Sequence, residues 1–164
     1  MPTTTTATFP QSEPLANMLK RAYLLLEHGE LELARKCIAQ SCERYPEQPL
    51  PHALQGAVEI AAGDLDRALK LLRQVARKWP EHPAPQLYLA EAFLLSQKLG
   101  QARRKVSLLQ DKLDALDPSH PDVIWREMAG HLAELCEHID SEQIPEPLRS
   151  YEEHEAISTR PNPL

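Results

Sequence analysis

The chain has 164 residues and a net charge of −6, so it is long enough to bury one core, and its acidic balance argues against sequence-independent binding to nucleic acid. Aromatic residues are 5% of the chain and there are only five glycines, a composition that disfavours a fold of short strands and turns. No apolar run approaches the ~18 residues of a membrane span, and the N-terminal residues lack the pattern of a secretory signal. We therefore expect a cytoplasmic protein with no membrane span.

The first 12 residues include five threonines and few side chains that could be buried, so we expect a disordered N-terminal tail over residues 1–12. The three cysteines, Cys37, Cys42 and Cys136, are too few and too irregularly placed for a disulfide framework. This usage is typical of a reducing compartment. We expect Cys37 and Cys42 to be buried as small apolar residues rather than to form a redox pair.

From residue 13 to about residue 118 the sequence repeats with a period of 34 residues. The connector at residues 44–51 returns at residues 78–85, with a basic residue, an aromatic residue, proline, glutamate and two further prolines in the same order. Gly29 and Gly63 each open the same phrase, and the alanines that close it recur at Ala34, Ala68 and Ala102. A fixed period of this length indicates a repeat architecture.

Each unit has the pattern of a helical hairpin. Its first half is apolar at helical spacing, as at Leu87 and Leu94, and glycine (Gln97 in the third unit) then allows a tight turn. The alanine lets two helices approach closely, and an amphipathic second helix follows until proline ends it. Pro118 comes four residues late, which predicts a second helix one turn longer in the third unit. We predict an all-α fold with three hairpins, over about residues 13–46, 47–80 and 81–118.

This layout resembles the tetratricopeptide repeat (TPR) family, whose units have about 34 residues, a turn glycine, small residues where the helices cross and a closing proline. The resemblance implies a right-handed TPR-type α-solenoid with a concave face lined by the first helix of each unit. The chain departs from the family at its early Trp and Tyr positions, which hold Met18, His52 and Gln86, and Leu25, Glu59 and Phe93.

After the third unit, residues 119–122 (Ser-His-Pro-Asp) have the pattern of a capping box. We expect a C-terminal capping helix within residues 119–139 that covers the open end of the stack with one apolar stripe, formed by Ile124, Met128, Leu132, Leu135 and Ile139. Residues 140–164 carry six acidic residues and two arginines, a net charge of −4, and we expect an acidic, proline-containing tail there.

The ionisable residues form no pattern that indicates catalysis. His131, Cys136 and His138 share one expected helix, but their spacing differs from the paired ligands of zinc sites. There is no glycine-rich phosphate loop and no nucleophile elbow. We expect a protein that is not an enzyme and uses no metal or cofactor. The basic run at residues 101–105 is expected to be a solvated helix face, with docking of an acidic partner or of the chain's own tail as the alternative.

The TPR resemblance implies that the concave groove is the binding surface. Its positions carry mostly aliphatic and small side chains, which suits a peptide with hydrophobic anchors, and core packing is the alternative use of some of them. The places where TPR co-chaperones hold basic and amide groups for a C-terminal carboxylate are apolar or phenolic here, so we expect no such clamp. The predicted groove residues are Leu19, Tyr23, Leu26, Leu50, Ala53, Ala57, Ile60, Ala84, Leu87, Glu91 and Leu94.

These features together predict a non-enzymatic protein-binding adaptor or chaperone that holds an apolar segment of a client. The chain is similar in architecture to the small TPR chaperones of bacterial type III secretion, and residues 85–95 are the part most like them. The alternative is a scaffold subunit of a larger secretion or motility assembly that uses its convex face or end helix. A homodimer is left open, and no nucleic-acid partner is expected.

Overall fold

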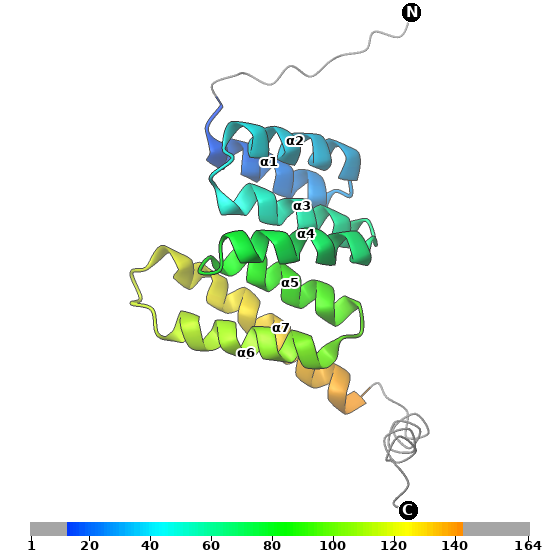
Figure 1. Ribbon diagram of the computed structural model, residues 1–164, viewed down its shortest axis with the longest axis vertical. Helices are drawn as coiled ribbons and strands as arrows, with labels where there is room; N and C mark the ends of the chain where they lie inside the picture. The colour runs from blue at the N-terminus through cyan, green and yellow to red at the C-terminus, as the bar shows by residue number, and fades with distance from the viewer. Residues whose placement is uncertain (1–12, 143–164) are drawn as a thin grey trace, which may run out of the picture.

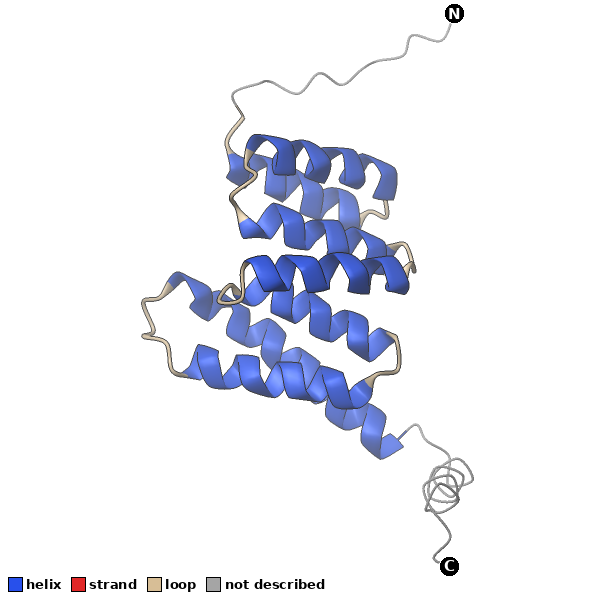
Figure 2. Cartoon of the chain, viewed as in Figure 1, coloured by secondary structure: helices blue, strands red, loops and turns tan. Residues whose placement is uncertain are grey.

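The structure, a computed structural model, describes residues 13–142. The expected N-terminal tail and the expected acidic tail from residue 143 onward lie outside the described residues. Within residues 13–142 every regular element is helical (Figure 2). The elements are α1 (Leu15–Glu27), α2 (Leu31–Arg44), α3 (Pro49–Ala61), α4 (Leu65–Lys78), α5 (Pro83–Leu95), α6 (Leu99–Asp114), the 3-10 turn η1 (Pro121–Ile124) and α7 (Trp125–Glu142).

The helices form three hairpins that stack along the long axis of the molecule, with α7 against the last of them (Figure 1). Each helix contacts the next one in the chain. The first helices of the hairpins also contact one another, α1 with α3 and α3 with α5, and α7 continues this row by contacting α5. The predicted all-α solenoid of three hairpins and a capping helix is confirmed.

The three hairpin turns are built in the same way. Gly29, Gly63 and Gln97 have φ angles of 72°, 80° and 60°, a region that glycine adopts without steric cost. The next N–H in each turn donates to the carbonyl five residues earlier, the bond that closes a Schellman motif at a helix end. These bonds join Glu30 to Leu25 (2.9 Å), Asp64 to Glu59 (3.0 Å) and Lys98 to Phe93 (2.8 Å).

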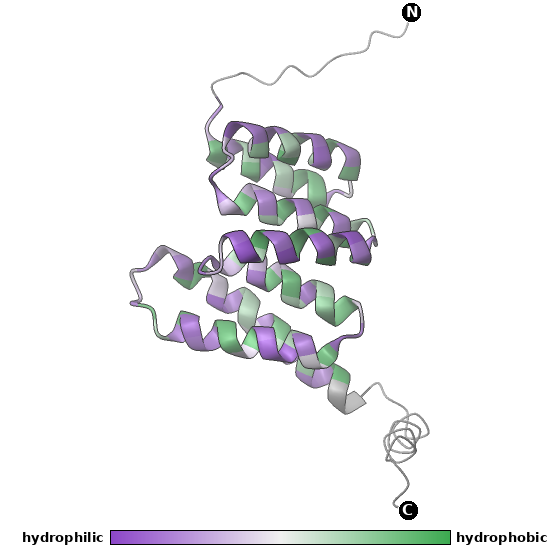
Figure 3. Ribbon diagram, viewed as in Figure 1, coloured by the Kyte–Doolittle hydropathy of each residue, from purple (hydrophilic) through white to green (hydrophobic). Residues whose placement is uncertain are grey.

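Small residues let the paired helices approach. Ala34, Ala68 and Ala102, which close the repeated phrase, are all 0% exposed. On α3, Gly56 lies against Leu72 of α4 so closely that a Cβ atom at Gly56 would be 2.3 Å from Leu72 Cγ. Most helices carry both apolar and polar residues, as expected when a helix buries one face, whereas α5, at the centre of the stack, is buried on nearly all sides (Figure 3).

Two predicted core positions are cysteines. Cys37 and Cys42 are free thiols with exposed fractions of 0% and 9%, as predicted from their place on α2. Burial, with the nearby charge of Glu43, raises the pKa of Cys42 to about 11. The Cys42 thiol is therefore protonated and unreactive at neutral pH.

The capping helix starts later than predicted. Ser119 does not cap it; instead His120 Nδ1 accepts a hydrogen bond from the Asp122 N–H at 3.1 Å and caps the 3-10 turn η1. The α-helix then begins at Trp125 and extends to Glu142. A His-Pro pair also begins α5, where His82 Nδ1 accepts from the Ala84 N–H at 3.2 Å.

Helix α7 also packs through a different face from the predicted one. Between residues 125 and 139, where its side chains are described, the buried ones are Trp125, Ala129 and Cys136. Three of the five residues predicted to form the buried stripe are exposed instead, namely Ile124 (73%), Met128 (39%) and Leu135 (50%). The other two, Leu132 and Ile139, are partly buried and pack against the core as predicted. The prediction was wrong for Ile124, Met128 and Leu135 because two apolar rows of α7 have helical spacing, and the row containing Trp125 is the one turned to the stack.

Two arginines fasten α7 to α6. Arg126 Nη2 donates to the carbonyls of Leu113 (2.6 Å) and Leu116 (3.1 Å), which satisfies carbonyl groups at the C-terminal end of α6. Arg103 Nη2 donates to the Cys136 carbonyl at 3.2 Å. Part of the basic run at residues 101–105 therefore stabilises the fold rather than forming a purely solvated face.

Candidate functional site

The inner side of the stack is formed by α1, α3, α5 and α7. The hydroxyl oxygens of Tyr23 on α1 and Tyr88 on α5 lie 3.3 Å apart, within hydrogen-bond distance, although α3 contacts both helices and lies between them. Side chains of α1 and α5 meet in this way because the row of helices curves toward this side. The residue of α3 equivalent to Tyr23 in the repeat is Ala57, a small residue.

The structure divides the eleven predicted groove residues into two groups. Seven of them are partly exposed: Leu19, Tyr23, Leu26, Leu50, Ala57, Ile60 and Glu91. The other four are buried in the core: Ala53 (0%), Ala84 (0%), Leu87 (1%) and Leu94 (9%). These four residues pack in the core, which was the alternative to a groove position. Leu87 also lines a surface pocket.

That pocket, of about 160 Å³, opens between α5 and α7. Three residues of each helix line it: Leu87, Tyr88 and Glu91 from α5, and Met128, His131 and Leu132 from α7. Sequence reasoning assigned α7 only a capping role and so missed its three residues. The available signal was the second apolar row on α7, which contains Met128 and is not needed for packing against the stack.

Three polar groups of the concave face, those of Tyr23, Tyr88 and Glu91, are poorly solvated. Burial raises the pKa of Tyr23 and Tyr88, and for Tyr88 the neighbouring Tyr23 and the charge of Glu91 add to the effect. Burial also raises the pKa of the Glu91 carboxyl group. One phenol donates to the other, so one hydroxyl hydrogen of the pair is left to donate to a ligand. The face thus offers apolar walls, one phenolic donor and one carboxylate.

Comparison with known proteins agrees with this geometry. A family model of the tetratricopeptide repeat matches residues 59–114, from the C-terminal part of α3 through α6. Residues 59–114 of the chain therefore contain tetratricopeptide repeats. No curated protein sequence matches it significantly.

Two solved structures share the fold of this TPR protein. One is a chain of a T3SS complex from Aeromonas hydrophila, with a TM-score of 0.58 and 18% identity over 79% of this chain and 84% of that chain. The other is the Sgt2 TPR domain from Aspergillus fumigatus, with a TM-score of 0.60 and 13% identity over 95% of this chain and 93% of that domain. At these identities the likeness is one of fold.

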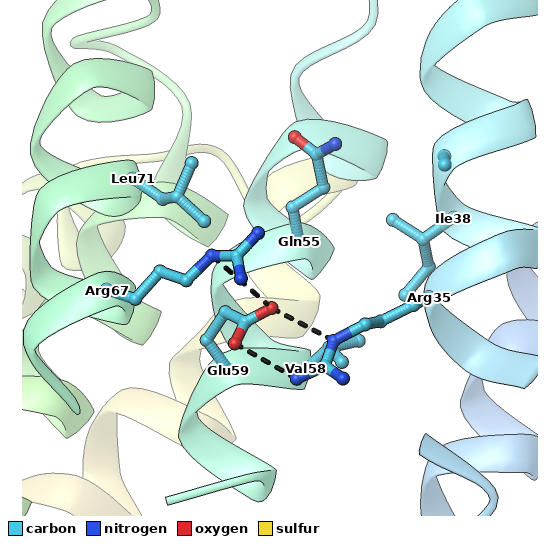
Figure 4. Close-up of a pocket in the computed structure, with 8 residues that line it drawn as sticks. Arg35, Ile38, Gln55, Val58, Glu59, Arg67 and Leu71 are labelled. Atoms are coloured by element: carbon cyan, nitrogen blue, oxygen red, sulfur yellow. Dashed lines mark hydrogen bonds and ion pairs between the residues drawn. The ribbon is translucent and has the colours of Figure 1, made fainter. Parts of the chain in front are cut away.

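The opposite face of α3 bears a second pocket, of about 250 Å³, between α2 and α4 (Figure 4). At its centre is Glu59, 3% exposed, at one of the positions where the TPR family has an aromatic residue. Arg35 donates to both Glu59 oxygens at 3.1 Å, and Arg67 Nε lies 3.9 Å from one of them. Arg35 also pairs with Glu32, so the charges of this cluster balance. The cluster links α2, α3 and α4 and serves the fold of this TPR protein.

Other chemistry has little support in the part of the chain that the structure describes. No three His, Cys, Asp or Glu side chains within it lie close enough to hold a metal ion. His131 lines the α5–α7 pocket, whereas Cys136 is buried and His138 is exposed, so these three do not form one site. None of the helices between residues 13 and 142 combines the length and apolar composition needed to cross a membrane.

Proposed function

We propose that this TPR protein is a non-enzymatic adaptor or chaperone that holds an apolar segment of a client protein in its concave groove. The observation that supports this proposal is the composition of the predicted groove, whose partly exposed residues on α1 and α3 are aliphatic apart from Tyr23. One protein of similar fold comes from a T3SS complex. We therefore propose a cytoplasmic type III secretion chaperone as the specific role.

Burial of apolar surface is the expected driving force for client binding. A segment that covers about 500 Å² of apolar surface gains about 12 kcal/mol at about 25 cal/mol per Å². The loss of translational freedom and the ordering of the client chain cancel much of this gain, which leaves affinities in the micromolar to nanomolar range.

Ala57 is the best position for a test, because it is a partly exposed groove residue of α3, the helix between α1 and α5. Leu87 is unsuitable, since it is 1% exposed and a polar substitution there would disrupt the core. We expect Ala57→Gln to obstruct the groove and to reduce client capture at least tenfold. Affinity capture with the tagged full chain from its source cells, followed by mass spectrometry, measures this effect.

The matched control is Ala39→Gln, which adds the same side chain at an exposed alanine of α2, beside the pocket that contains Glu59. This variant should capture the client as the wild type does, and circular dichroism should show equal helix content in all three proteins. Equal capture by the Ala57 and Ala39 variants would contradict the proposal.

The exposed apolar residues of α7 favour a second candidate, a scaffold subunit that binds through its end helix. Ile124 and Leu135 lie on this helix and its preceding turn with 73% and 50% exposure. A scaffold should capture several stable components, and it should keep them in Ala57→Gln but lose them in Leu135→Glu. A chaperone should capture one otherwise insoluble client.

A further inference from the structure

The pocket between α5 and α7 contains a carboxylate without a partner. Among the side chains that the structure describes, no hydrogen bond or ion pair joins Glu91 to another group. Two basic side chains of the adjacent helix α6 bond elsewhere: Lys105 Nζ donates to Gln86 Oε1 at 3.0 Å, and Arg103 donates to the Cys136 carbonyl. The raised pKa of Glu91 has burial as its cause, which means that the carboxylate has lost water without gaining a donor.

The walls around this carboxylate are largely apolar. Leu87 of α5 and Met128 and Leu132 of α7 line the same pocket as Glu91. A long side chain with an aliphatic stem and a cationic end fits such a site, because its stem can lie on the apolar walls while its end meets the carboxylate. An apolar side chain would desolvate the carboxylate further, and an acidic one would add a like charge. The flexible Met128 side chain can adjust to either length of basic residue.

We propose that this pocket binds a lysine or arginine side chain of the client segment, with Glu91 as its counter-charge. The inference rests on the proposed function, because the segment reaches the pocket along the concave groove. It predicts a client motif in which one basic residue stands among apolar anchors. It also makes α7 part of the binding site, through Met128 and Leu132.

A display library of random dodecapeptides, selected on the full-length chain, tests the inference without a known client. The wild type should enrich peptides with several apolar residues and with lysine or arginine at one fixed place. Glu91→Gln removes the charge but keeps the size of the side chain. It should still enrich apolar peptides, but without the basic residue.

A second pair of variants does not alter Glu91. Met128→Lys adds a cationic side chain to the pocket that contains Glu91. This variant should therefore also lose the preference for peptides with a basic residue. Leu108→Lys is the matched control, because Leu108 is 57% exposed on α6 and does not line the pocket. It should select the same peptides as the wild type.

One selected peptide then gives the size of the effect. Replacing its basic residue with norleucine should weaken binding to the wild type about tenfold, measured by fluorescence anisotropy, and should leave binding to Glu91→Gln unchanged. A basic preference that persists in Glu91→Gln would overturn the inference and leave the groove hypothesis standing. If the wild type enriches no apolar peptide, or Ala57→Gln binds the selected peptides equally well, the proposed function fails and this inference fails with it.

Discussion

Gln97 occupies the turn position that Gly29 and Gly63 occupy in the other two hairpins, and its φ angle is 60°. A residue with a side chain costs about 1–2 kcal/mol in this region of backbone conformation. Glycine avoids that cost but loses more conformational entropy on folding, by about 0.5–1 kcal/mol. We therefore expect Gln97→Gly to raise the free energy of unfolding by about 0.5–1 kcal/mol, measured by urea denaturation.

The reverse substitution serves as the control. Gly63 has φ of 80°, and no heavy atom lies within 4 Å of the place where its Cβ would be, so only the backbone is tested there. Gly63→Ala should lower the free energy of unfolding by about 1 kcal/mol. If both substitutions changed stability in the same direction, the explanation from backbone conformation would be wrong.

His82 gives the protein a pH-dependent helix start. Its Nδ1 accepts the Ala84 N–H at the beginning of α5, and burial lowers the pKa of the imidazole below its ordinary 6.5, with a partial opposing effect of Asp122. The unfolded chain then binds a proton more readily than the folded one. The contribution of His82 to the free energy of unfolding is therefore at its maximum above about pH 6.5, and it is lost as the pH decreases through the lowered pKa. Melting temperatures at about pH 7.5 and pH 5 should show this loss.

His82→Asn separates this group from the other titrating residues. Asparagine is a good N-cap and does not titrate, so the variant should remain folded and should lose less stability between the two pH values than the wild type. An unchanged pH dependence would show that His82 does not contribute to it.

At this scale the sequence predicted the turn glycines, because few other residues adopt a positive φ without cost. It also placed Gln97 in the third turn, but only through the period, since nothing about glutamine itself indicates a turn. The capping roles of His82 and His120 were not predicted. Histidine is not among the usual N-cap residues, and its Nδ1 acts here as the acceptor that a serine or aspartate oxygen usually provides.

At the scale of helices, the packing of α3 on α4 depends on their close approach at Gly56. A Cβ at this position would lie 2.3–2.8 Å from three carbon atoms of Leu72, which is itself fully buried and cannot move aside freely. Alanine improves helix propensity by about 1 kcal/mol, but overpacking of a core costs about 1–3 kcal/mol. We expect Gly56→Ala to lower the free energy of unfolding by up to about 2 kcal/mol in urea denaturation.

Gly130 of α7 provides the matched control, since it is also helical and has no atom within 4 Å of its Cβ position. Gly130→Ala should stabilise the protein by about 0.5–1 kcal/mol. Stabilisation by both substitutions would show that Leu72 yields without cost.

The buried face of α7 is the feature of a single helix that the sequence did not predict. The three hairpins repeat, so each predicts the buried face of the others. The capping helix has no counterpart in the repeat and carries two apolar rows of equal spacing, one containing Trp125 and the other Met128. Periodicity cannot choose between two such rows. The choice depends on which side chains fit the exposed edge of the last hairpin.

For the whole molecule, the period predicted the architecture, because a stack of hairpins is held mainly by packing between neighbouring hairpins. The concave face was predicted less completely. Equivalent positions in the three units have different burial, as with Leu19, partly exposed, and Ala53 and Leu87, both buried. Of the pocket between α5 and α7, Leu87 and Glu91 were predicted as groove residues, but the α7 side was not, since it depends on the face that the capping helix turns to the groove.

The hydrogen bond between Tyr23 and Tyr88 tethers the first hairpin directly to the third. The bond joins two helices, α1 and α5, that both contact α3 and are not neighbours in the row. A peptide chain that runs along this face from α1 to the α5–α7 pocket therefore has to pass over the two phenol rings or replace their hydrogen bond with one of its own.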